Sequence, residues 1–506
     1  MSLAIVHSRA SAGINAPLVI VEVHLSKGLP GLSISGLPET AVKESRHRVR
    51  SAIVNSQLEF PVSRITVNLA PADLPKEGGR FDLAIALGIL AASGQIPGEA
   101  LHSYEFAGEL ALSGLLRPIT GALPFAMATK KENRQLIITA ANWEEATLLE
   151  NVPIFAAQHL LEVCAHLRGV TPLSPLFSRD RRTSSTRYPD LQDVIGQVHG
   201  KRALEIAAAG GHSLLFVGPP GTGKTMLATR LPGILPPLSV DEALEVAAVY
   251  SMGHQGFHYE QWGVRPFRAP HHTVSAAAMV GGSTPPRPGE ISLAHSGVLF
   301  LDELPEFDRH VLESLREPLE AGWITISRAA HQARFPSRFQ LMAAMNPCPC
   351  GYLGDVRQHC RCTREQVQRY HARLSGPLLD RIDMHIEIPP VSASLLLNST
   401  HERGEGSGFV RQRVIVAREK QWQRAAKLNT SLLGEEIEHH CTLSSLTKQF
   451  LEETMTKWHW SARAYHRILK LARTIADLDD QATIQPDHLR EALSYRCLEK
   501  AVRSFE

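Results

Sequence analysis

The first part of the chain alternates short apolar runs with longer helical stretches. Leu18 to Val23 and Ile65 to Asn68 are rich in β-branched residues, whereas Glu39 to Val54 and Phe81 to Ala92 have the length and composition of helices. Such an alternation favours a domain of mixed secondary structure. The sequence therefore predicts an α+β domain over residues 1–170.

A second group of apolar runs begins near residue 190. The helical stretch Val198 to Ala209 leads into the apolar run Ser213 to Val217, and Val298 to Leu301 is another apolar run of strand length. Runs of four to eight apolar residues are typical of buried strands. The pattern predicts a second domain with buried strands and helices over residues 190–398.

The segment after residue 303 is predicted to form a helix and then a hairpin. Leu304 to Gly322 has apolar residues at helical spacing and predicts one amphipathic helix. Trp323 to Arg328 and Phe335 to Ala343 have strand character. The basic tip between these two strands contains Arg328, His331 and Arg334.

Beyond residue 398 the apolar positions recur at helical spacing. Four helices are predicted, at Val410 to Leu428, Ser444 to Lys457, Ala462 to Leu478 and Pro486 to Lys500. The first of them carries six basic residues, which fit either a solvated face or a nucleic-acid surface. We expect a helical domain over residues 399–506.

Composition changes this picture only in part. A chain of 506 residues is long enough for about three domains, and residues 171–189, rich in Pro, Ser, Thr and Arg, are typical of a linker. The net charge of +2 gives no general argument for a nucleic-acid partner. No secretory signal and no apolar run of 18 residues is present, so a cytoplasmic protein without a membrane partner is expected.

A phosphate-binding loop follows the run Ser213 to Val217. The pattern is Gly, four residues, Gly, Lys and Thr, in which backbone N–H groups and the lysine bind nucleotide phosphates and the Thr hydroxyl binds magnesium. It predicts sites for ATP and magnesium. The residues are Gly218, Pro219, Pro220, Gly221, Thr222, Gly223, Lys224 and Thr225.

Two carboxylates at the end of an apolar strand supply the partner that such a loop requires. Asp302 and Glu303 follow Val298 to Leu301, as in a Walker B element. We expect Asp302 to hold the magnesium ion and Glu303 to polarise the attacking water. Lys224 and Glu303 are thus the first catalytic candidates.

Four of the seven cysteines lie in two close pairs, Cys348 with Cys350 and Cys360 with Cys362. Two such pairs supply four thiolates for a structural zinc ion. The spacing is Cys-x-Cys, His359 could replace one ligand, and four reduced cysteines without metal remain the alternative.

The motifs together resemble the magnesium-chelatase branch of the AAA+ ATPases, and nearly the whole chain resembles the ComM/YifB family within it. The resemblance rests on the Val194-Ile195-Gly196-Gln197 stretch, the Walker elements and Leu374 to Asp383. It implies a P-loop core with a parallel sheet and helices on both faces, and a helical C-terminal lid domain.

The resemblance also implies roles for residues outside the Walker elements. The backbone of Val194 and Ile195 would contact the adenine base, and Asn346 would be the sensor that positions the lytic water. Arg381 would be an arginine finger that reaches a neighbouring subunit's site.

A second sensor arginine is expected in the lid domain. Arg463 matches the residue that contacts the γ-phosphate in related proteins, and Arg467, one turn further along, is the alternative.

The first domain resembles the proteolytic domain of Lon proteases over Pro71 to Asp82. Arg80 occupies the position of the nucleophilic serine, and an arginine cannot act as a nucleophile there. The resemblance therefore implies a Lon-like fold without peptidase activity.

Two segments are candidates for DNA contact. The stretch inserted between Lys224 and Asp302 contains Arg268, His271 and His272 near an aromatic residue, a combination suited to phosphate contact and base stacking. An intersubunit loop is the alternative. In related ATPases a hairpin at the position of Arg328, His331 and Arg334 projects into the ring channel; a solvated hairpin is the alternative here.

Family resemblance implies a ring, most often a hexamer, that uses ATP hydrolysis to move along DNA. It implies helicase activity in branch migration during homologous recombination or the integration of transforming DNA. The alternative is a chelatase-like motor for metal insertion or protein remodelling, against which we count the Lon-like N-terminal domain.

Overall fold

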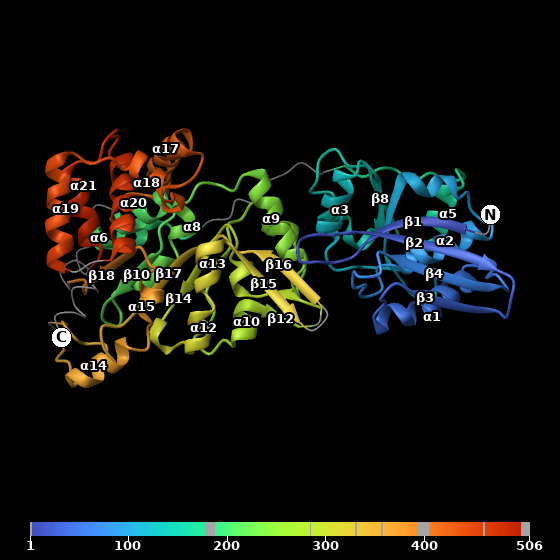
Figure 1. Ribbon diagram of the computed structural model, residues 1–506, viewed down its shortest axis with the longest axis horizontal. Helices are drawn as coiled ribbons and strands as arrows, with labels where there is room; N and C mark the ends of the chain where they lie inside the picture. Colours follow the sequence, from blue (N-terminus) through green and yellow to red (C-terminus); the bar gives the residue numbers. More distant parts are fainter. Residues whose placement is uncertain are drawn as a thin grey trace.

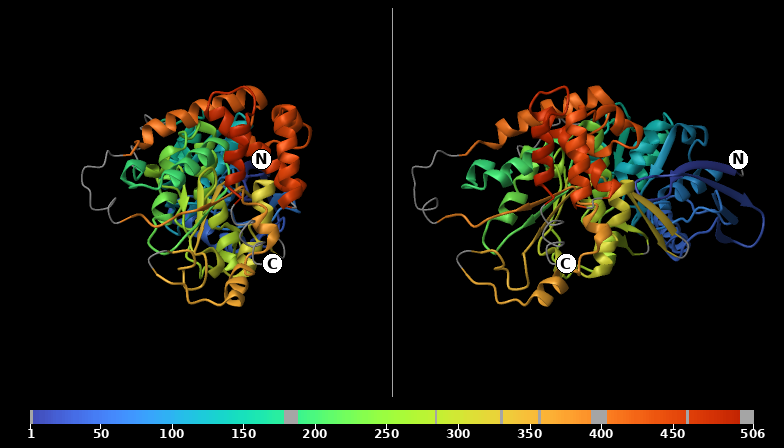
Figure 2. Two further views of the ribbon diagram at one scale, coloured as in Figure 1. Left: turned by 90° about the vertical axis from the view of Figure 1, so that its left-hand side faces the viewer. Right: turned by 60° about the vertical axis from the view of Figure 1, so that its left-hand side comes forward.

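The computed structural model describes residues 3–177, 188–283, 285–328, 331–355, 358–392, 404–458 and 461–496. In Figure 1 the N-terminal domain lies at one end of an elongated molecule and the helices of the C-terminal region lie at the other. A central parallel sheet lies between them, and the right-hand view of Figure 2 again shows the N-terminal domain at one end of the molecule.

The N-terminal domain is built on a seven-stranded mixed sheet in the order β3-β4-β2-β1-β5-β8-β9. Its central helix, α2, is apolar on every side, and all eleven of its residues are buried, as expected for a helix enclosed by its domain. The strands are β1 (Leu3–Arg9), β2 (Leu18–Ser26), β3 (Gly31–Ser35), β4 (Arg64–Ala70), β5 (Tyr104–Ala107), β8 (Gln135–Thr139) and β9 (Ile154–Ala157), with a small ribbon of β6 (Glu109–Leu110) and β7 (Leu116–Arg117). The helices are α1 (Thr40–Asn55), α2 (Asp82–Ala92), α3 (Ala122–Lys131), α4 (Trp143–Ala146) and α5 (Leu160–Leu167).

The central sheet has five parallel strands in the order β11-β14-β17-β10-β18. Alternate residues of β10, β14 and β17 enter two different apolar cores, one on each face, which confirms the predicted parallel-sheet core between helical layers. The strands are β10 (Leu214–Val217), β11 (Phe267–Arg268), β14 (Val298–Leu301), β17 (Gln340–Met345) and β18 (Met384–Glu387).

Helices cover both faces of this sheet, and two short antiparallel ribbons project from it. The helices are α6 (Val198–Gly210), α7 (Lys224–Ala228), α8 (Leu231–Ile234), α9 (Val240–Ser251), α10 (Ala276–Val280), α11 (Glu290–Leu293), α12 (Arg309–Glu313), α13 (Arg316–Ala321), α14 (Arg364–His371) and α15 (Gly376–Leu379). The ribbons pair β12 (Gly281–Gly282) with β13 (Arg287–Pro288), and β15 (Trp323–Arg328) with β16 (His331–Pro336).

Two predicted elements of this region are wrong in extent. The single helix expected over Leu304 to Gly322 is a 3-10 turn followed by α12 and α13, with Asp308 capping α12; proline lacks a backbone N–H and interrupts a continuous helix, and Pro305 and Pro318 lie in this stretch. The strand expected over Phe335 to Ala343 is divided between β16 and β17.

Five helices follow the core in the ranges 404–458 and 461–496: α17 (Ser407–Ala425), α18 (Glu435–His440), α19 (Ser445–Trp458), α20 (Ala462–Leu478) and α21 (Pro486–Ser494). The bounds of α20 agree with the prediction. This helix packs against α6 and α17 within one apolar core that also includes strands of the sheet. The helical region is therefore attached directly to the central sheet.

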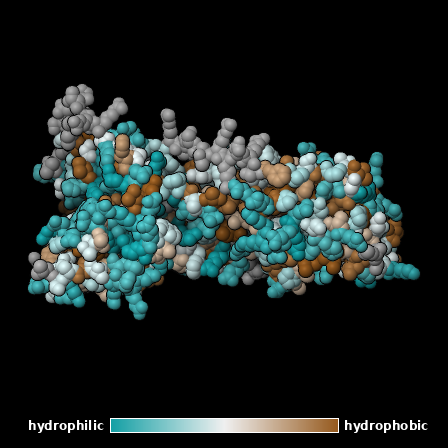
Figure 3. Space-filling model, turned by 90° about the horizontal axis from the view of Figure 1, so that it is seen from above, coloured by the Kyte–Doolittle hydropathy of each residue, from teal (hydrophilic) through white to brown (hydrophobic). Residues whose placement is uncertain are grey.

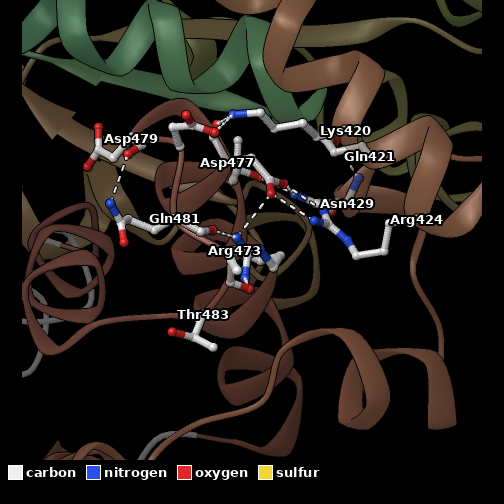
Figure 4. A network of polar contacts seen from close by, with 12 residues as sticks. Lys420, Gln421, Arg424, Asn429, Arg473, Asp477, Asp479, Gln481 and Thr483 are labelled. Carbon is white, nitrogen blue, oxygen red and sulfur yellow. Dashed lines mark hydrogen bonds and ion pairs between the residues drawn. The ribbon is translucent and has the colours of Figure 1, made fainter.

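Ion pairs explain most of the basic residues of α17. Figure 4 shows Arg424 and Arg473 converging on the carboxylate of Asp477, with Asn429 beside them. Five of the six predicted cations, all but Arg411, bond to other parts of the chain; they are Arg413, Arg418, Lys420, Arg424 and Lys427. Several of these pairs are partly exposed, among them Arg413 with Glu405 and Lys420 with Asp480, so they are compatible with the solvated face expected from the sequence.

The N-terminal domain meets the core through α3 and α9, which share an apolar cluster containing Phe125, Ala247 and Trp262. The hydroxyl of Ser251 also donates a hydrogen bond of 2.5 Å to the buried carboxylate of Glu145. Burial raises the pKa of Glu145.

Within the described ranges, no helix is both long and apolar enough to cross a membrane. The face seen in Figure 3 is mostly polar, with small apolar patches between the polar residues.

Candidate active site

The phosphate loop lies at the carboxyl end of β10, where the chain turns into α7. Gly221 and Gly223 have φ angles of 76° and 90°, which glycine adopts without steric cost. Lys224 is buried, and its Nζ atom donates hydrogen bonds to the carbonyl oxygens of Gly218 (2.6 Å) and Pro219 (2.9 Å). Burial lowers the pKa of Lys224, and the charges of Asp302 and Glu303 oppose that shift.

The predicted magnesium ligands lie next to each other. The Thr225 hydroxyl donates a hydrogen bond of 2.6 Å to Oδ2 of Asp302, although 77 residues separate them. A hydroxyl and a carboxylate are the oxygen donors that magnesium takes in nucleotide sites. The donor set therefore fits this ion.

Glu303 follows Asp302 at the carboxyl end of β14. Its backbone is left-handed, with a φ of 55°, and its N–H donates to Oδ1 of Asp302 at 3.0 Å. Its carboxylate is 56% exposed, so solvent reaches the group that is expected to polarise water.

Asn346 comes directly after β17, the strand that separates β10 from β14. Its Oδ1 atom accepts a hydrogen bond of 3.2 Å from Nζ of Lys224. The fold thus brings the lysine, the two acids and the amide to one edge of the sheet.

The segment expected to contact adenine lies beside the phosphate loop. Val194 is buried and Ile195 is half exposed. The neighbouring Gln197, to which the sequence assigned no role, donates from Nε2 to the carbonyl oxygens of Thr222 (3.0 Å) and Pro389 (2.7 Å). Gln197 therefore ties this segment to the phosphate loop, and its place in the Val-Ile-Gly-Gln stretch was the available indication.

Two of the predicted DNA-contact residues have partners within the chain in this conformation. Arg268 makes a bidentate ion pair with Glu290, with both contacts at 2.7 Å, and Glu290 raises the pKa of Arg268. Nδ1 of His272 lies 3.1 Å from a carboxylate oxygen of Glu303, and the centre of the tilted His271 ring lies 4.1 Å from that of His272. The guanidinium of Arg268 is therefore paired within the chain, and the imidazole of His272 lies at the sheet edge that carries Glu303.

Sequence reasoning missed the contact of His272 because β11 is only two residues long. The strands β11 and β14 are parallel neighbours, so the segments that follow them emerge at the same edge of the sheet. A prediction of β11 would have placed the two histidines close to Glu303.

The predicted hairpin is present as β15 and β16, paired from Trp323 with Pro336 to Arg328 with His331. The guanidinium of Arg334 lies 3.6 Å from the centre of the Trp323 ring, a cation–π contact. The side chains of Arg328 and His331 lie outside the described part of the structure.

Arg381 lies at the opposite edge of the sheet from the phosphate loop of its own chain. Its carbonyl oxygen accepts from Ser213, which precedes β10, whereas the loop follows β10. Its guanidinium pairs with Glu320 at 2.5 Å and is 9% exposed. Arg381 does not reach the site of its own subunit in this conformation.

Arg463 lies in the first turn of α20 and is exposed. Arg467, one turn along, pairs with Asp383, which immediately precedes β18 at the amino end of the sheet. The pair with Asp383 therefore places Arg467, and not Arg463, at the edge opposite its own phosphate loop. The γ-phosphate contact of Arg463 stays a prediction.

The four predicted cysteine ligands form one cluster in which all sulfur atoms lie within 4.8 Å of one another. Burial raises the pKa of Cys350, but backbone N–H groups of Tyr352 and Arg361 outweigh it and bring this pKa to about 6. His359 is exposed and is not among the clustered ligands. The chemistry of the set fits zinc without it.

Arg80, at the position of the Lon serine, is buried and donates a hydrogen bond to the carbonyl oxygen of Thr120 at 2.9 Å. Burial lowers its pKa to about 10. Lys76 is fully buried and hydrogen-bonded to the carbonyl oxygen of Pro71. These two cations serve internal contacts of the domain.

Three sequence profiles match the chain. The profile described as magnesium chelatase, subunit ChlI, matches residues 190–396. Those described as subunit ChlI of Mg-chelatase and as the ChlI C-terminal part match residues 21–142 and 404–496.

Relatives match over the full length. The competence protein ComM of Haemophilus influenzae is 53% identical over 510 residues, covering 100% of this chain and 99% of its own. YifB of Salmonella typhimurium is 54% identical over 502 residues, covering 99% and 98%. The magnesium-chelatase subunit ChlI of Trieres chinensis is 24% identical over 247 residues, which is 44% of this chain and 63% of its own. The chain belongs to the ComM/YifB family of magnesium-chelatase-like AAA+ ATPases.

Proposed function

We propose that this protein is an ATP-hydrolysing motor that acts on DNA as a ring. In this proposal it is a helicase that promotes branch migration during homologous recombination or the integration of transforming DNA. ATP and magnesium are its cofactors.

The meeting of Lys224, Asp302 and Asn346 at one sheet edge supports hydrolysis. The ends of three different strands supply the parts: a cation for the phosphates, an acid for the metal and an amide for the water. Such a convergence is what phosphoryl transfer to water requires. Glu303 is the proposed group that polarises this water.

The 53% identity to a competence protein over the whole chain is the observation that carries the choice of DNA. Arg268 is engaged within the chain, and His272 contacts Glu303. His271, which is exposed, and the hairpin of β15 and β16 therefore stay our candidates for DNA contact.

The position of Arg381 supports a ring. AAA+ proteins usually assemble, and an arginine at the edge opposite its own phosphate loop can complete only a neighbour's site. Six subunits is our proposal for the ring size. Arg463 is proposed to act in the same way, from one subunit on the nucleotide of another.

A chelatase-like or protein-remodelling motor is the second candidate. The N-terminal domain, which we counted against it, does not argue against it, because residues 21–142 match a profile of the chelatase subunit itself. The full-length identity still favours the ComM relationship, since the chelatase subunit matches less than half of the chain.

The test is ATP turnover by the purified protein without DNA and with single strands, forks and four-way junctions, each at two salt concentrations. Glu303→Gln serves as the blank because it keeps the fold and removes the proposed base. We expect branched DNA to stimulate turnover, and the stimulation to weaken with salt as phosphate contacts are screened.

Turnover that no DNA changes would refute the proposal. A tetrapyrrole or a protein that stimulated turnover instead would establish the second candidate. The cysteine cluster is proposed to bind one structural zinc ion per chain.

A further inference from the structure

We propose that the zinc ion held by Cys348, Cys350, Cys360 and Cys362 is a clasp for the catalytic sensor, which keeps Asn346 in position against Lys224 and the phosphate loop. The inference rests on the proposed ATPase activity of the site and does not depend on the nature of the polymer that the motor acts on.

The sulfur geometry fits one tetrahedral ion. With Zn–S bonds of about 2.3 Å, the sulfur atoms of a tetrahedral site lie about 3.8 Å apart. Here Sγ of Cys348 lies 3.4 Å from that of Cys350 and 3.6 Å from that of Cys360, and Cys350 to Cys360 is also 3.6 Å. Four sulfur ligands close the coordination shell, so this is a structural site and not a catalytic one.

Backbone N–H groups are directed at the sulfur atoms as in a thiolate site. The N–H of Cys362 donates to Sγ of Cys360 at 3.4 Å, and the N–H of Leu353 bonds to Cys348. Such outer contacts orient metal ligands.

The cluster joins two segments that enclose Asn346. The first cysteine pair follows β17 directly after Asn346 and Pro347, and the second pair precedes α14. From the end of α14 the chain returns to the sensor: the backbone of Asn346 bonds to the Tyr370 hydroxyl, and His371 contacts the carbonyl oxygen of Pro347 at 2.9 Å. The zinc ion would join the two cysteine pairs and so hold together the segment after β17 and the segment before α14.

The same loop rests on the phosphate loop. A Cβ atom at Gly351 would lie 2.8 Å from Cδ of Pro220 and 3.8 Å from Cγ of Asn346. Gly351 itself is held by a hydrogen bond of 2.9 Å from its N–H to the carbonyl oxygen of Cys348. A shift of the cysteine loop is therefore a shift at the contact between the sensor and the nucleotide site.

This arrangement predicts a specific defect when zinc is lost. The lysine and the phosphate loop keep their own contacts, so the nucleotide still binds, whereas the amide that positions water is no longer fixed. Removal of one preorganised polar group from an active site lowers kcat by about 10² to 10³. We expect loss of zinc to act through kcat and not through nucleotide affinity.

The experiment compares the wild type, Asn346→Ala, the double variant Cys360→Ser/Cys362→Ser, and the combination of all three changes. Zinc is measured by mass spectrometry, nucleotide affinity with a fluorescent ATP analogue, and basal ATP turnover without DNA. Cys164→Ala is the control, because Cys164 is a buried free thiol of α5 outside the cluster.

We expect about one zinc per chain in the wild type and in Cys164→Ala, and none in the double variant. The double variant should lose about as much turnover as Asn346→Ala, and the combination should lose no more, because the two changes remove one interaction. Nucleotide affinity should stay within about threefold.

Three outcomes would overturn the proposal. They are a folded wild type without zinc, a zinc-free variant with normal turnover, and a combined variant in which the separate losses of turnover multiply. If the double variant does not fold, zinc is withdrawn from the wild type with a chelator and then returned. Turnover that disappears and recovers while nucleotide binding persists supports the proposal, and turnover that is indifferent to zinc refutes it. None of these results depends on whether DNA stimulates the enzyme.

Discussion

Four side chains from three segments meet at the carboxyl edge of the central sheet. Lys224 and Thr225 follow β10, Asp302 follows β14, and Asn346 follows β17, the strand that lies between the other two. Their separation along the chain is large, but the parallel order of the strands places Lys224 3.2 Å from Asn346 and Thr225 2.6 Å from Asp302. The chemistry of the site is therefore a consequence of strand order.

Gly351 allows the cysteine loop to approach the phosphate loop. Its φ of 85° disfavours any side chain, and a Cβ atom would lie 2.8 Å from Pro220. We expect Gly351→Ala to weaken binding of a fluorescent ATP analogue by about tenfold, which corresponds to about 1.4 kcal/mol, and to leave the zinc content unchanged.

Gly354 supplies a matched control. Its φ of 81° is nearly the same, but no atom of the described residues lies within 4 Å of a Cβ built there. Gly354→Ala should therefore show the effect of an alanine at positive φ alone, without a steric contact. Equal affinities for the two variants would mean that the contact with Pro220 has no effect on nucleotide binding.

At the scale of elements, one buried carboxylate joins the helical region to the sheet. Asp383 precedes β18, accepts from the backbone N–H of Ser213 before β10 at 3.0 Å, and pairs with Arg467 of α20. Burial alone would raise the pKa of Asp383, but Arg467, His212 and the Ser213 N–H outweigh it and hold the pKa far below its ordinary value.

We expect Asp383→Asn to lower the free energy of unfolding by about 3–5 kcal/mol at pH 7, because it leaves Arg467 without its buried partner. A carboxyl whose pKa is depressed on folding stabilises the protein above its unfolded pKa of about 3.9, and this contribution is lost as the pH falls below that value. Urea unfolding of wild type and variant at several pH values tests the prediction, and their midpoints should converge in acid.

Asp480→Asn is the control for that measurement. Asp480 also pairs with a cation of the helical region, Lys420, but it is 88% exposed, and exposed pairs contribute about 0–1 kcal/mol. If both variants lose the same stability, the burial of Asp383 is not what makes its pair strong.

At the scale of the whole molecule, patterns local in sequence predicted elements well and their partners poorly. The bounds of α20 and the strand before the phosphate loop followed from apolar spacing and flanking residues. The partners of Arg268 and of the α17 cations did not, because Glu290, Asp477 and Glu205 come near them only after folding. A basic residue on a predicted helix has the same local pattern whether it meets solvent, DNA or a distant carboxylate.

The opposite positions of the phosphate loop and Arg381 make a prediction for the assembly. If each site takes its acid from one subunit and its arginine from the next, Glu303→Gln and Arg381→Ala should each be inactive alone, the second by about 10³- to 10⁵-fold. Co-expressed in one ring, they should recover roughly a quarter of the wild-type turnover, since that share of randomly formed interfaces joins an intact acid to an intact arginine.

The mixed ring separates action between subunits from action within one. Arg381 pairs with Glu320 in the isolated chain, so it has to leave that carboxylate to reach a neighbour's nucleotide. Glu320→Gln should therefore leave turnover intact or raise it. If the ion pair were purely structural, Glu320→Gln and Arg381→Ala would each lower the stability of the protein. If both variants assemble normally and the mixed rings are as inactive as their parents, Glu303 and Arg381 act on the nucleotide from the same subunit. A site shared between two subunits would then be excluded.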